Sequence, residues 1–127
     1  MKLERADADI RLAEKLCSSE WNPSNDEMMY DMAAYHAQQG IEKLLKHILH
    51  DIYGMDETSR KFRTHKIYDL ISMLEEDYSY TVPDELTEMS IKITDWEAQS
   101  RYGDDIVATR EDILRAVEIY QRIREHL

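Results

Sequence analysis

The chain has few residues that interrupt regular structure, with only 3 glycines and 2 prolines among 127 residues. This scarcity argues against short strands joined by tight hairpins and favours long helices. The single cysteine, Cys17, cannot form a disulfide within the chain, so we expect a reducing compartment. No apolar run approaches the ~20 residues of a membrane span, and the first residues lack a signal-peptide core. We therefore expect a cytoplasmic protein with no membrane contact.

Positive charge is also scarce. The sequence holds 16 lysines and arginines against 27 aspartates and glutamates, which gives a net charge of -11. Non-specific binding of nucleic acid depends on neutralising phosphates with lysine and arginine, so this balance excludes a general nucleic-acid coat. It leaves room for one local basic site, because fields are local at physiological salt.

The length and the 43% of hydrophobic residues fit a single domain over residues 1–127. Apolar residues recur at spacings of three and four, which is typical of one face of a helix. The pattern predicts five helices: Leu3 to about Ser18, Asp26 to Tyr53, one from near Thr64, one from Pro83 and one from about Thr109. No long stretch alternates with period two. We therefore expect an all-α, up-and-down bundle of four to five antiparallel helices.

Local signals mark several helix ends. Ser24 or Asn25 is a candidate N-cap for the second helix. Gly54 has the position of a left-handed C-terminal cap. Thr109 with Asp112 resembles an acidic capping box before the fifth helix.

A polar stripe borders the apolar face of the second, longest helix. It consists of His36, Gly40, Lys43, His47 and His50. His47 and His50 lie one turn apart, a spacing that two metal ligands on a helix can use. No cysteine, aspartate or glutamate shares the stripe, so the ligand set is incomplete. We expect no metal and no cofactor, and we interpret the stripe as part of an interface.

Three segments carry a family resemblance. They are "MAAYHAQQGIEKLLKHIL" (Met32 to Leu49), "THKIYDLISML" (Thr64 to Leu74) and "EAQSRYGDD" (Glu97 to Asp105). In order and spacing they resemble the signature helix, the histidine-led segment and the late arginine-tyrosine segment of the HEPN family (higher eukaryotes and prokaryotes nucleotide-binding domain). The chain departs from the family pattern at Gly40, where alanine is usual, and at Gly103, where proline is common.

The resemblance implies a helical bundle that is usually a homodimer. Some members are metal-independent ribonucleases with a late Arg-x4-6-His motif, and others lack it and work beside a small nucleotidyltransferase. Arg101 stands where the arginine belongs, but none of residues 106–108 is histidine. The spacing does occur from Arg60 to His65, but a match of this kind is expected about once by chance in this sequence.

The candidate ligand- or partner-binding residues are Arg101, Tyr102, Asp104, His36, Lys43, His47 and His65. We expect His36, Gly40, Lys43 and His47, together with Arg101 and Tyr102, to lie in or beside a dimer cleft. Two simpler interpretations stay open for the late segment. Glu97 and Arg101 can form an exposed pair at spacing four before a glycine stop. Asp104 and Asp105 can hold a cation or supply N-terminal charge to the fifth helix.

Two functional hypotheses follow. The first is a non-catalytic HEPN-like module that binds a nucleotide or a partner protein, associated with a small nucleotidyltransferase in a toxin–antitoxin-like pair. The second is a metal-independent ribonuclease with a displaced catalytic histidine, His65. Cleavage through the 2′-hydroxyl needs a group that accepts a proton near pH 7, and histidine is the usual one. Because the late segment contains none, we expect no RNA cleavage by the protein alone.

Overall fold

The computed structural model describes residues 3–101 and 108–127, and of residues 98–101 it describes the helical backbone only. The described residues form helices and no strand, which confirms the all-α fold. The elements are α1 (Leu3–Leu16), α2 (Glu27–His47), the π-helical turn η1 (Ile48–Ile52), α3 (Ile67–Asp77), α4 (Asp84–Arg101) and α5 (Arg110–Glu125).

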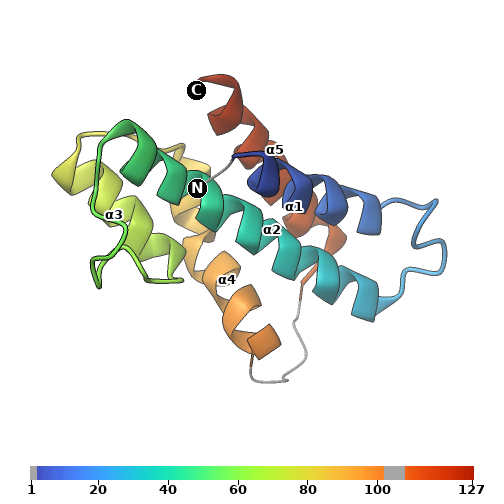
Figure 1. The fold of residues 1–127 in the computed structure, drawn as a ribbon. Helices are drawn as coiled ribbons and strands as arrows, with labels where there is room; N and C mark the ends of the chain where they lie inside the picture. Colours follow the sequence, from blue (N-terminus) through green and yellow to red (C-terminus); the bar gives the residue numbers. More distant parts are fainter. Residues whose placement is uncertain (1–2, 102–107) are drawn as a thin grey trace.

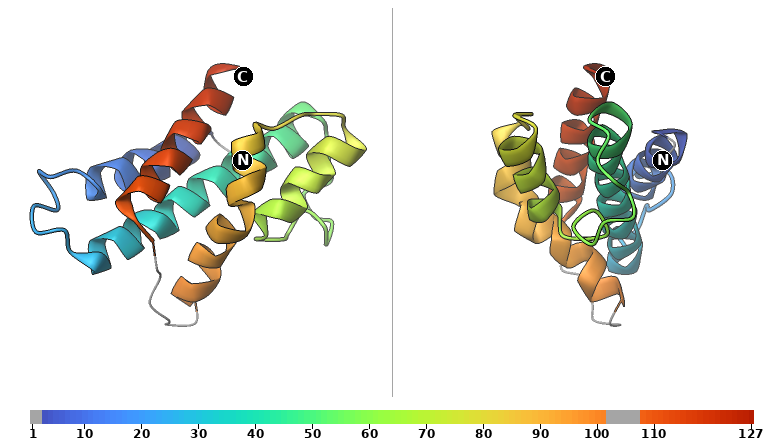
Figure 2. Two further views of the ribbon diagram at one scale, coloured as in Figure 1. Left: turned by 180° about the vertical axis from the view of Figure 1, so that it is seen from behind. Right: turned by 60° about the vertical axis from the view of Figure 1, so that its left-hand side comes forward.

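The second helix lies at the centre of the bundle and packs against each of the other four helices (Figure 1). Helix α1 lies alongside α2, and α5 crosses both of these helices (Figure 2). Helices α3 and α4 pack against each other at the end where η1 lies. The loop that joins η1 to α3 therefore lies beside α3 rather than over the α1–α2 pair.

The close approach of α1 and α2 depends on Gly40. A Cβ atom at this position would lie 2.7 Å from the Ile10 side chain and 3.2 Å from the Ala6 carbonyl oxygen. Real Cβ atoms almost never come as close to another heavy atom as 2.7 Å, and 3.2 Å is tighter than most Cβ contacts. Ala6, Ala33 and Ala37 are fully buried and also small. The departure from the family's usual alanine at Gly40 thus has a packing reason in this chain.

The ends of α2 differ in part from the sequence predictions. Asp26 is the N-cap, with its side chain accepting a hydrogen bond from the Met28 N–H at 2.9 Å. The prediction of Ser24 or Asn25 was wrong, since Asn25 adopts a left-handed backbone (φ 55) that turns the chain before the helix. The predicted stop at Gly54 is confirmed: its φ is 74, and its N–H donates to the His50 carbonyl at 2.9 Å.

Two later helix starts also bear on the site. Helix α3 begins at Ile67 instead of near Thr64, because Lys66 keeps an extended backbone and donates its N–H to the Thr64 hydroxyl at 3.1 Å. The cap of α5 is confirmed, since Thr109 accepts a hydrogen bond from the Asp112 N–H at 3.1 Å. The delayed start of α3 leaves residues 53–66 as one long connecting loop.

Candidate functional site

The predicted polar stripe does not act as one unit. His36 and Lys43 both face α1, where they meet Asp9: the His36 Nδ1 atom lies 3.0 Å from the carboxylate, and the Lys43 ammonium donates to its other oxygen. The Asp9 side chain is only 15% exposed. Burial alone would raise the pKa of Asp9, but the hydrogen bonds from His36 and Lys43 outweigh burial and lower it. The two contacts of Asp9 therefore stabilise the packing of α1 against α2.

The rest of the stripe has other neighbours. His47 lies 2.8 Å from the carboxylate of Asp51, one turn further along the chain. The Nδ1 atom of His50 lies 2.8 Å from the Met55 carbonyl oxygen, so this ring holds the beginning of the long loop. His47 and His50 thus contact acceptors within their own segment. In the described part of the chain, no group of three or more His, Cys, Asp or Glu residues is placed to hold a metal ion.

A buried polar network on α2 was missed by the sequence reasoning. Gln38, Glu42 and Lys46 follow one another at intervals of four, and their exposed fractions are 0%, 7% and 6%. The Glu42 carboxylate accepts from the Gln38 amide at 3.0 Å and from the Lys46 ammonium at 3.2 Å. Three polar residues at helical spacing, set beside an apolar face, were the signal that could have revealed it. A buried carboxylate with this many donors is held in one position.

His65 completes this network from the long loop. Its Nδ1 atom lies 3.1 Å and 3.3 Å from the two Glu42 oxygens, and its carbonyl accepts from Gln38 at 3.4 Å. The side chain of His65 is nevertheless 46% exposed. When Nδ1 carries the proton, it donates a hydrogen bond to the Glu42 carboxylate. Nε2 is then left as an acceptor with no partner among the described residues. His65 is thus an oriented imidazole on a buried carboxylate, open to solvent.

A hydrogen bond two residues after His65 joins the start of α3 to α4. The Ile67 N–H donates to the Thr94 hydroxyl at 2.9 Å, which brings the first residue of α3 against α4. Thr94 lies two turns before Arg101, where α4 ends, or about 10 Å along the helix axis. His65 and the end of α4 therefore belong to the same region of the molecule, whereas His36 and Lys43 face α1.

Several predicted residues fall outside this description. The side chain of Arg101 and all of Tyr102 and Asp104 lie outside the described residues. The two interpretations left open for Asp104 and Asp105, and the pair of Glu97 with Arg101, involve the same segment. Glu97 itself is buried, with 8% exposed.

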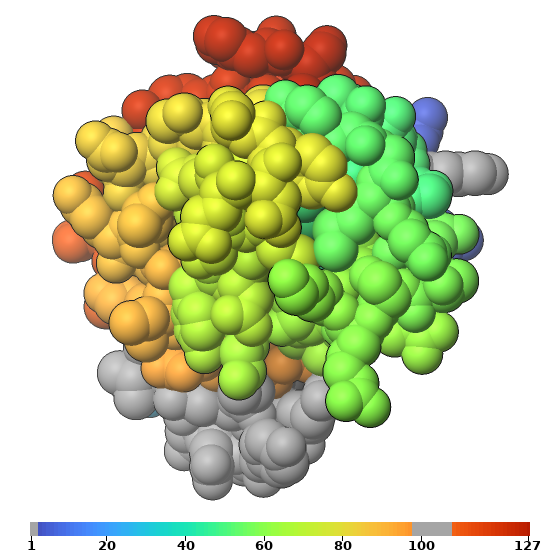
Figure 3. Space-filling model, turned by 90° about the vertical axis from the view of Figure 1, so that its left-hand side faces the viewer, coloured from blue at the N-terminus to red at the C-terminus, as the bar shows by residue number. Residues whose placement is uncertain are grey.

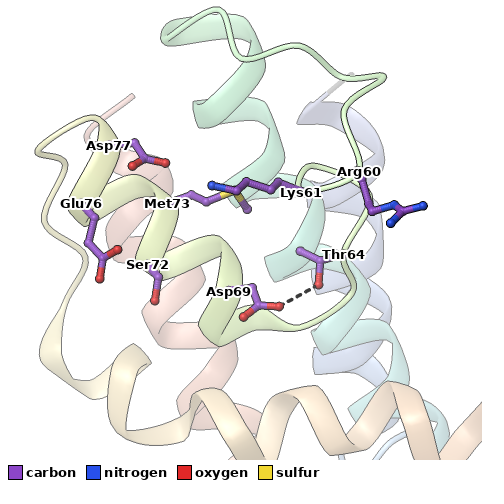
Figure 4. Close-up of a pocket in the computed structure, with 8 residues that line it drawn as sticks. All are labelled: Arg60, Lys61, Thr64, Asp69, Ser72, Met73, Glu76 and Asp77. Carbon is purple, nitrogen blue, oxygen red and sulfur yellow. Dashed lines mark hydrogen bonds between the residues drawn. The ribbon is translucent and has the colours of Figure 1, made fainter.

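A pocket of about 440 Å³ lies between the loop and α3, and Thr64, the residue before His65, is part of its lining. Figure 4 shows its two walls: Arg60, Lys61 and Thr64 come from the loop, and acidic residues including Asp69 come from α3. The Thr64 hydroxyl donates to Asp69 at 3.2 Å and joins the walls at one end. The loop side of the pocket is therefore positively charged and the α3 side negatively charged.

The comparisons with known proteins agree with the fold. The family model described as HEPN domain matches residues 2–127, nearly the whole chain. No curated protein and no solved structure matches the chain. In the described residues, no helix is long and apolar enough to cross a membrane.

Proposed function

Because the chain belongs to the HEPN domain family, a family of nucleotide-binding and ribonuclease-type modules, we propose that it is a binding module without nuclease activity of its own. Its ligand is a nucleotide, and its protein partner is a small nucleotidyltransferase. The proposed binding region is the end of the molecule where His65 and the end of α4 lie. Arg101, Tyr102 and Asp104 belong to this region by sequence.

The observation that supports this region best is the Glu42–His65 contact. The side chains that join α1 to α2 are less exposed, with 26% for His36 and 27% for Lys43. His65 differs, because its carboxylate partner is buried while its own ring is 46% exposed. An exposed ring fixed by a buried acid is preorganised to meet a ligand, since little rotamer freedom is lost on binding.

Calorimetric titration with AMP and ATP tests this proposal. We expect binding by the wild type and at least a tenfold weaker affinity for His65→Ala, because the variant loses a contact to the ligand. His126→Ala is the matched control, as His126 is exposed near the end of the chain. Absence of binding to either nucleotide would remove the nucleotide from the proposal, and equal affinities of the two histidine variants would move the site away from His65.

The proposed nucleotidyltransferase partner suggests a toxin–antitoxin-like pair. We further propose that the chain forms a homodimer, as the family resemblance implies. Sedimentation at tens of micromolar should show a dimer, because an interface of standard size is stable at that concentration. A monomer under these conditions would argue against the dimer, and failure to co-purify with a co-expressed neighbouring nucleotidyltransferase would argue against the partner.

One observation favours a second candidate function, a ribonuclease that uses His65. Glu42 can orient the imidazole so that Nε2 takes the proton of an RNA 2′-hydroxyl. The 2′-oxygen then bonds to phosphorus, the bond to the 5′-oxygen breaks, and that oxygen takes a proton from water. This function would also require Arg101 to stabilise the charge on phosphate.

A labelled single-stranded RNA separates the two candidates. The binding module leaves the RNA intact. Cleavage by the wild type that is lost in His65→Ala and in Arg101→Ala, and reduced in Glu42→Gln, would establish the ribonuclease instead.

A further inference from the structure

The long loop before α3 concentrates positive charge in an acidic protein. Residues 60–66 include Arg60, Lys61, Arg63 and Lys66, which is a quarter of all the lysines and arginines in a chain of net charge -11. No acidic residue occurs between Glu57 and Asp69. We call this segment the basic loop. The four cations repel one another at this short spacing, so such a local cluster calls for an explanation.

The four cations of the basic loop are exposed, and none forms an ion pair with a described residue. Elsewhere, the cations that lie within 4 Å of a carboxylate are Lys43, Lys46, Lys92, Arg115, Arg122 and Arg124. The fold thus pairs six described cations with carboxylates and leaves the four of the basic loop, like Arg5, Arg11 and Lys15 of α1, without an ion pair in the described residues. The pKa of Asp56 is lowered by its hydrogen bonds with Thr58 and, to a smaller extent, by the charge of Arg63. The charges of the basic loop are available to an external anion.

Contacts with α2 and η1 hold the backbone of the basic loop in place. Phe62 is only 6% exposed, with the Lys46 ammonium 5.4 Å from its ring centre and the His50 ring 6.1 Å away, edge-on. Two turns support the same segment: Arg63 N–H donates to the Arg60 carbonyl at 3.3 Å, and Thr64 N–H to the Lys61 carbonyl at 3.4 Å. The exposed cations therefore extend from an anchored backbone, which lowers the entropy cost of binding.

The surroundings of the basic loop restrict the shape of the anion. The loop (green) and α3 (yellow-green) lie side by side on the face seen in Figure 3. In Figure 4, Arg60 points away from the acidic wall of α3, whereas Lys61 reaches across the pocket toward Met73 and Asp77. The carboxylates of Asp69, Glu76 and Asp77 repel phosphates on the α3 side. An anion must therefore follow the narrow edge of the loop.

An exposed aromatic residue follows the basic loop in the sequence. Tyr68 follows Lys66 by two residues on the first turn of α3, and it is 36% exposed. Aromatic rings next to a row of cations are the usual combination in proteins that bind single-stranded nucleic acid, because bases stack on the rings while phosphates meet the cations. A duplex would place its second strand against the acidic wall.

We infer that the basic loop binds the phosphates of a single-stranded nucleic acid, with a base stacked on Tyr68. Four cations spread over seven residues exceed what one phosphate can engage, so the ligand extends over several nucleotides. This inference rests on the proposed nucleotide binding at His65 and extends the bound nucleotide into a strand. The basic loop holds the strand beside His65, and binding requires no cleavage.

Fluorescence anisotropy with a labelled twelve-nucleotide oligo(U) RNA, at 50 to 200 mM salt, tests the inference. The variant Arg60→Gln, Lys61→Gln, Arg63→Gln, Lys66→Gln should lose at least tenfold in affinity. Each phosphate contact of a single strand contributes about -0.7 to the slope of log K against log salt, so its slope should flatten by about 2 to 3. Tyr68→Ala should weaken binding without changing the slope, because a stacked ring releases no counterion.

The control variant removes four positive charges outside the basic loop, through Arg5→Gln, Arg11→Gln, Lys15→Gln and Lys92→Gln. It should keep most of the affinity. Equal losses in the two variants would reduce the effect to net charge and overturn the inference. Equally effective competition by polyphosphate, at matched phosphate concentration, would also overturn it by making the loop a general polyanion site.

The proposed function and this inference can fail separately. If ATP binding depends on His65 but the wild type binds the RNA no better than the loop variant, the inference is wrong and the proposed function stands. If the RNA binds through the loop while neither nucleotide binds at His65, the proposed nucleotide binding at His65 is wrong. The strand is then not an extension of a nucleotide held at His65, and the binding of the strand by the basic loop stands.

Discussion

Charged side chains differ in their partners between the helix pair α1–α2 and the long loop before α3. On the α1 side, Asp7 accepts hydrogen bonds from Tyr120 and Arg124, and Asp9 contacts both His36 and Lys43. On the loop side, the four cations form no ion pair with a described carboxylate, and His65 contacts a buried carboxylate while its ring faces solvent. A charged side chain therefore serves the fold when another helix supplies its partner, and it can meet a ligand when no such partner is present. Its position on one face of a helix does not decide this.

The largest expected effect comes from separating α1 from α2. Gly40→Val should destabilise the protein by about 1–3 kcal/mol, because its side chain would overlap Ile10 and the Ala6 carbonyl in a packed core. Valine has a higher helix propensity than glycine, so propensity alone would not destabilise this variant, and Met32→Val, at a half-exposed position of the same helix, shows the effect of a valine outside the core. Urea unfolding measures both. A Gly40→Val protein as stable as the control would mean that the two helices are not in such close contact.

A smaller loss is expected when the acid between the helices is removed. Asp9→Ala leaves His36 and Lys43 partly buried without their acceptor, which should cost about 1–2 kcal/mol. Asp95→Ala, at an exposed position of α4, is the matched control. Equal midpoints of urea unfolding for these two variants would remove the distinction between the α1 side and the open surface.

The same contacts predict how stability depends on pH. Burial raises the pKa of Asp7 and of Asp9, but the hydrogen bonds each carboxylate accepts outweigh burial, so both pKa values lie below the usual 3.8. A depressed folded pKa stabilises the protein above the unfolded pKa, and this contribution is lost as pH falls through the folded value. Stability should therefore drop below about pH 4. The double variant Asp7→Asn, Asp9→Asn should show a shallower drop.

The smallest effect on stability is expected at the basic loop. The variant with glutamine at positions 60, 61, 63 and 66 should unfold within about 0.5 kcal/mol of the wild type, because the four cations that it lacks are exposed and form no ion pair with a described residue. Thermal and urea unfolding would check this. A loss comparable to that of Asp9→Ala would show that these charges stabilise the fold.

Much of the fold could be predicted from local sequence. The five helices, the left-handed stop at Gly54 and the cap at Thr109 all depend on periodicity or on one residue's backbone preference. The candidate site was less accessible. His36 and Lys43 looked like His47 on one stripe, and only the packing of α1 brings Asp9 to the first two. Glu42 and His65 lie 23 residues apart, and no local pattern joins them.

The most direct test compares two histidines that the sequence could not separate. Both His36 and His65 contact a carboxylate, but the partner of His36 lies between two helices and the ring of His65 is open to solvent. Titration of ATP into His36→Ala and His65→Ala measures the difference. The account predicts wild-type affinity with lower stability for His36→Ala, and at least tenfold weaker binding with a retained fold for His65→Ala. Loss of ATP binding in His36→Ala alone would contradict it.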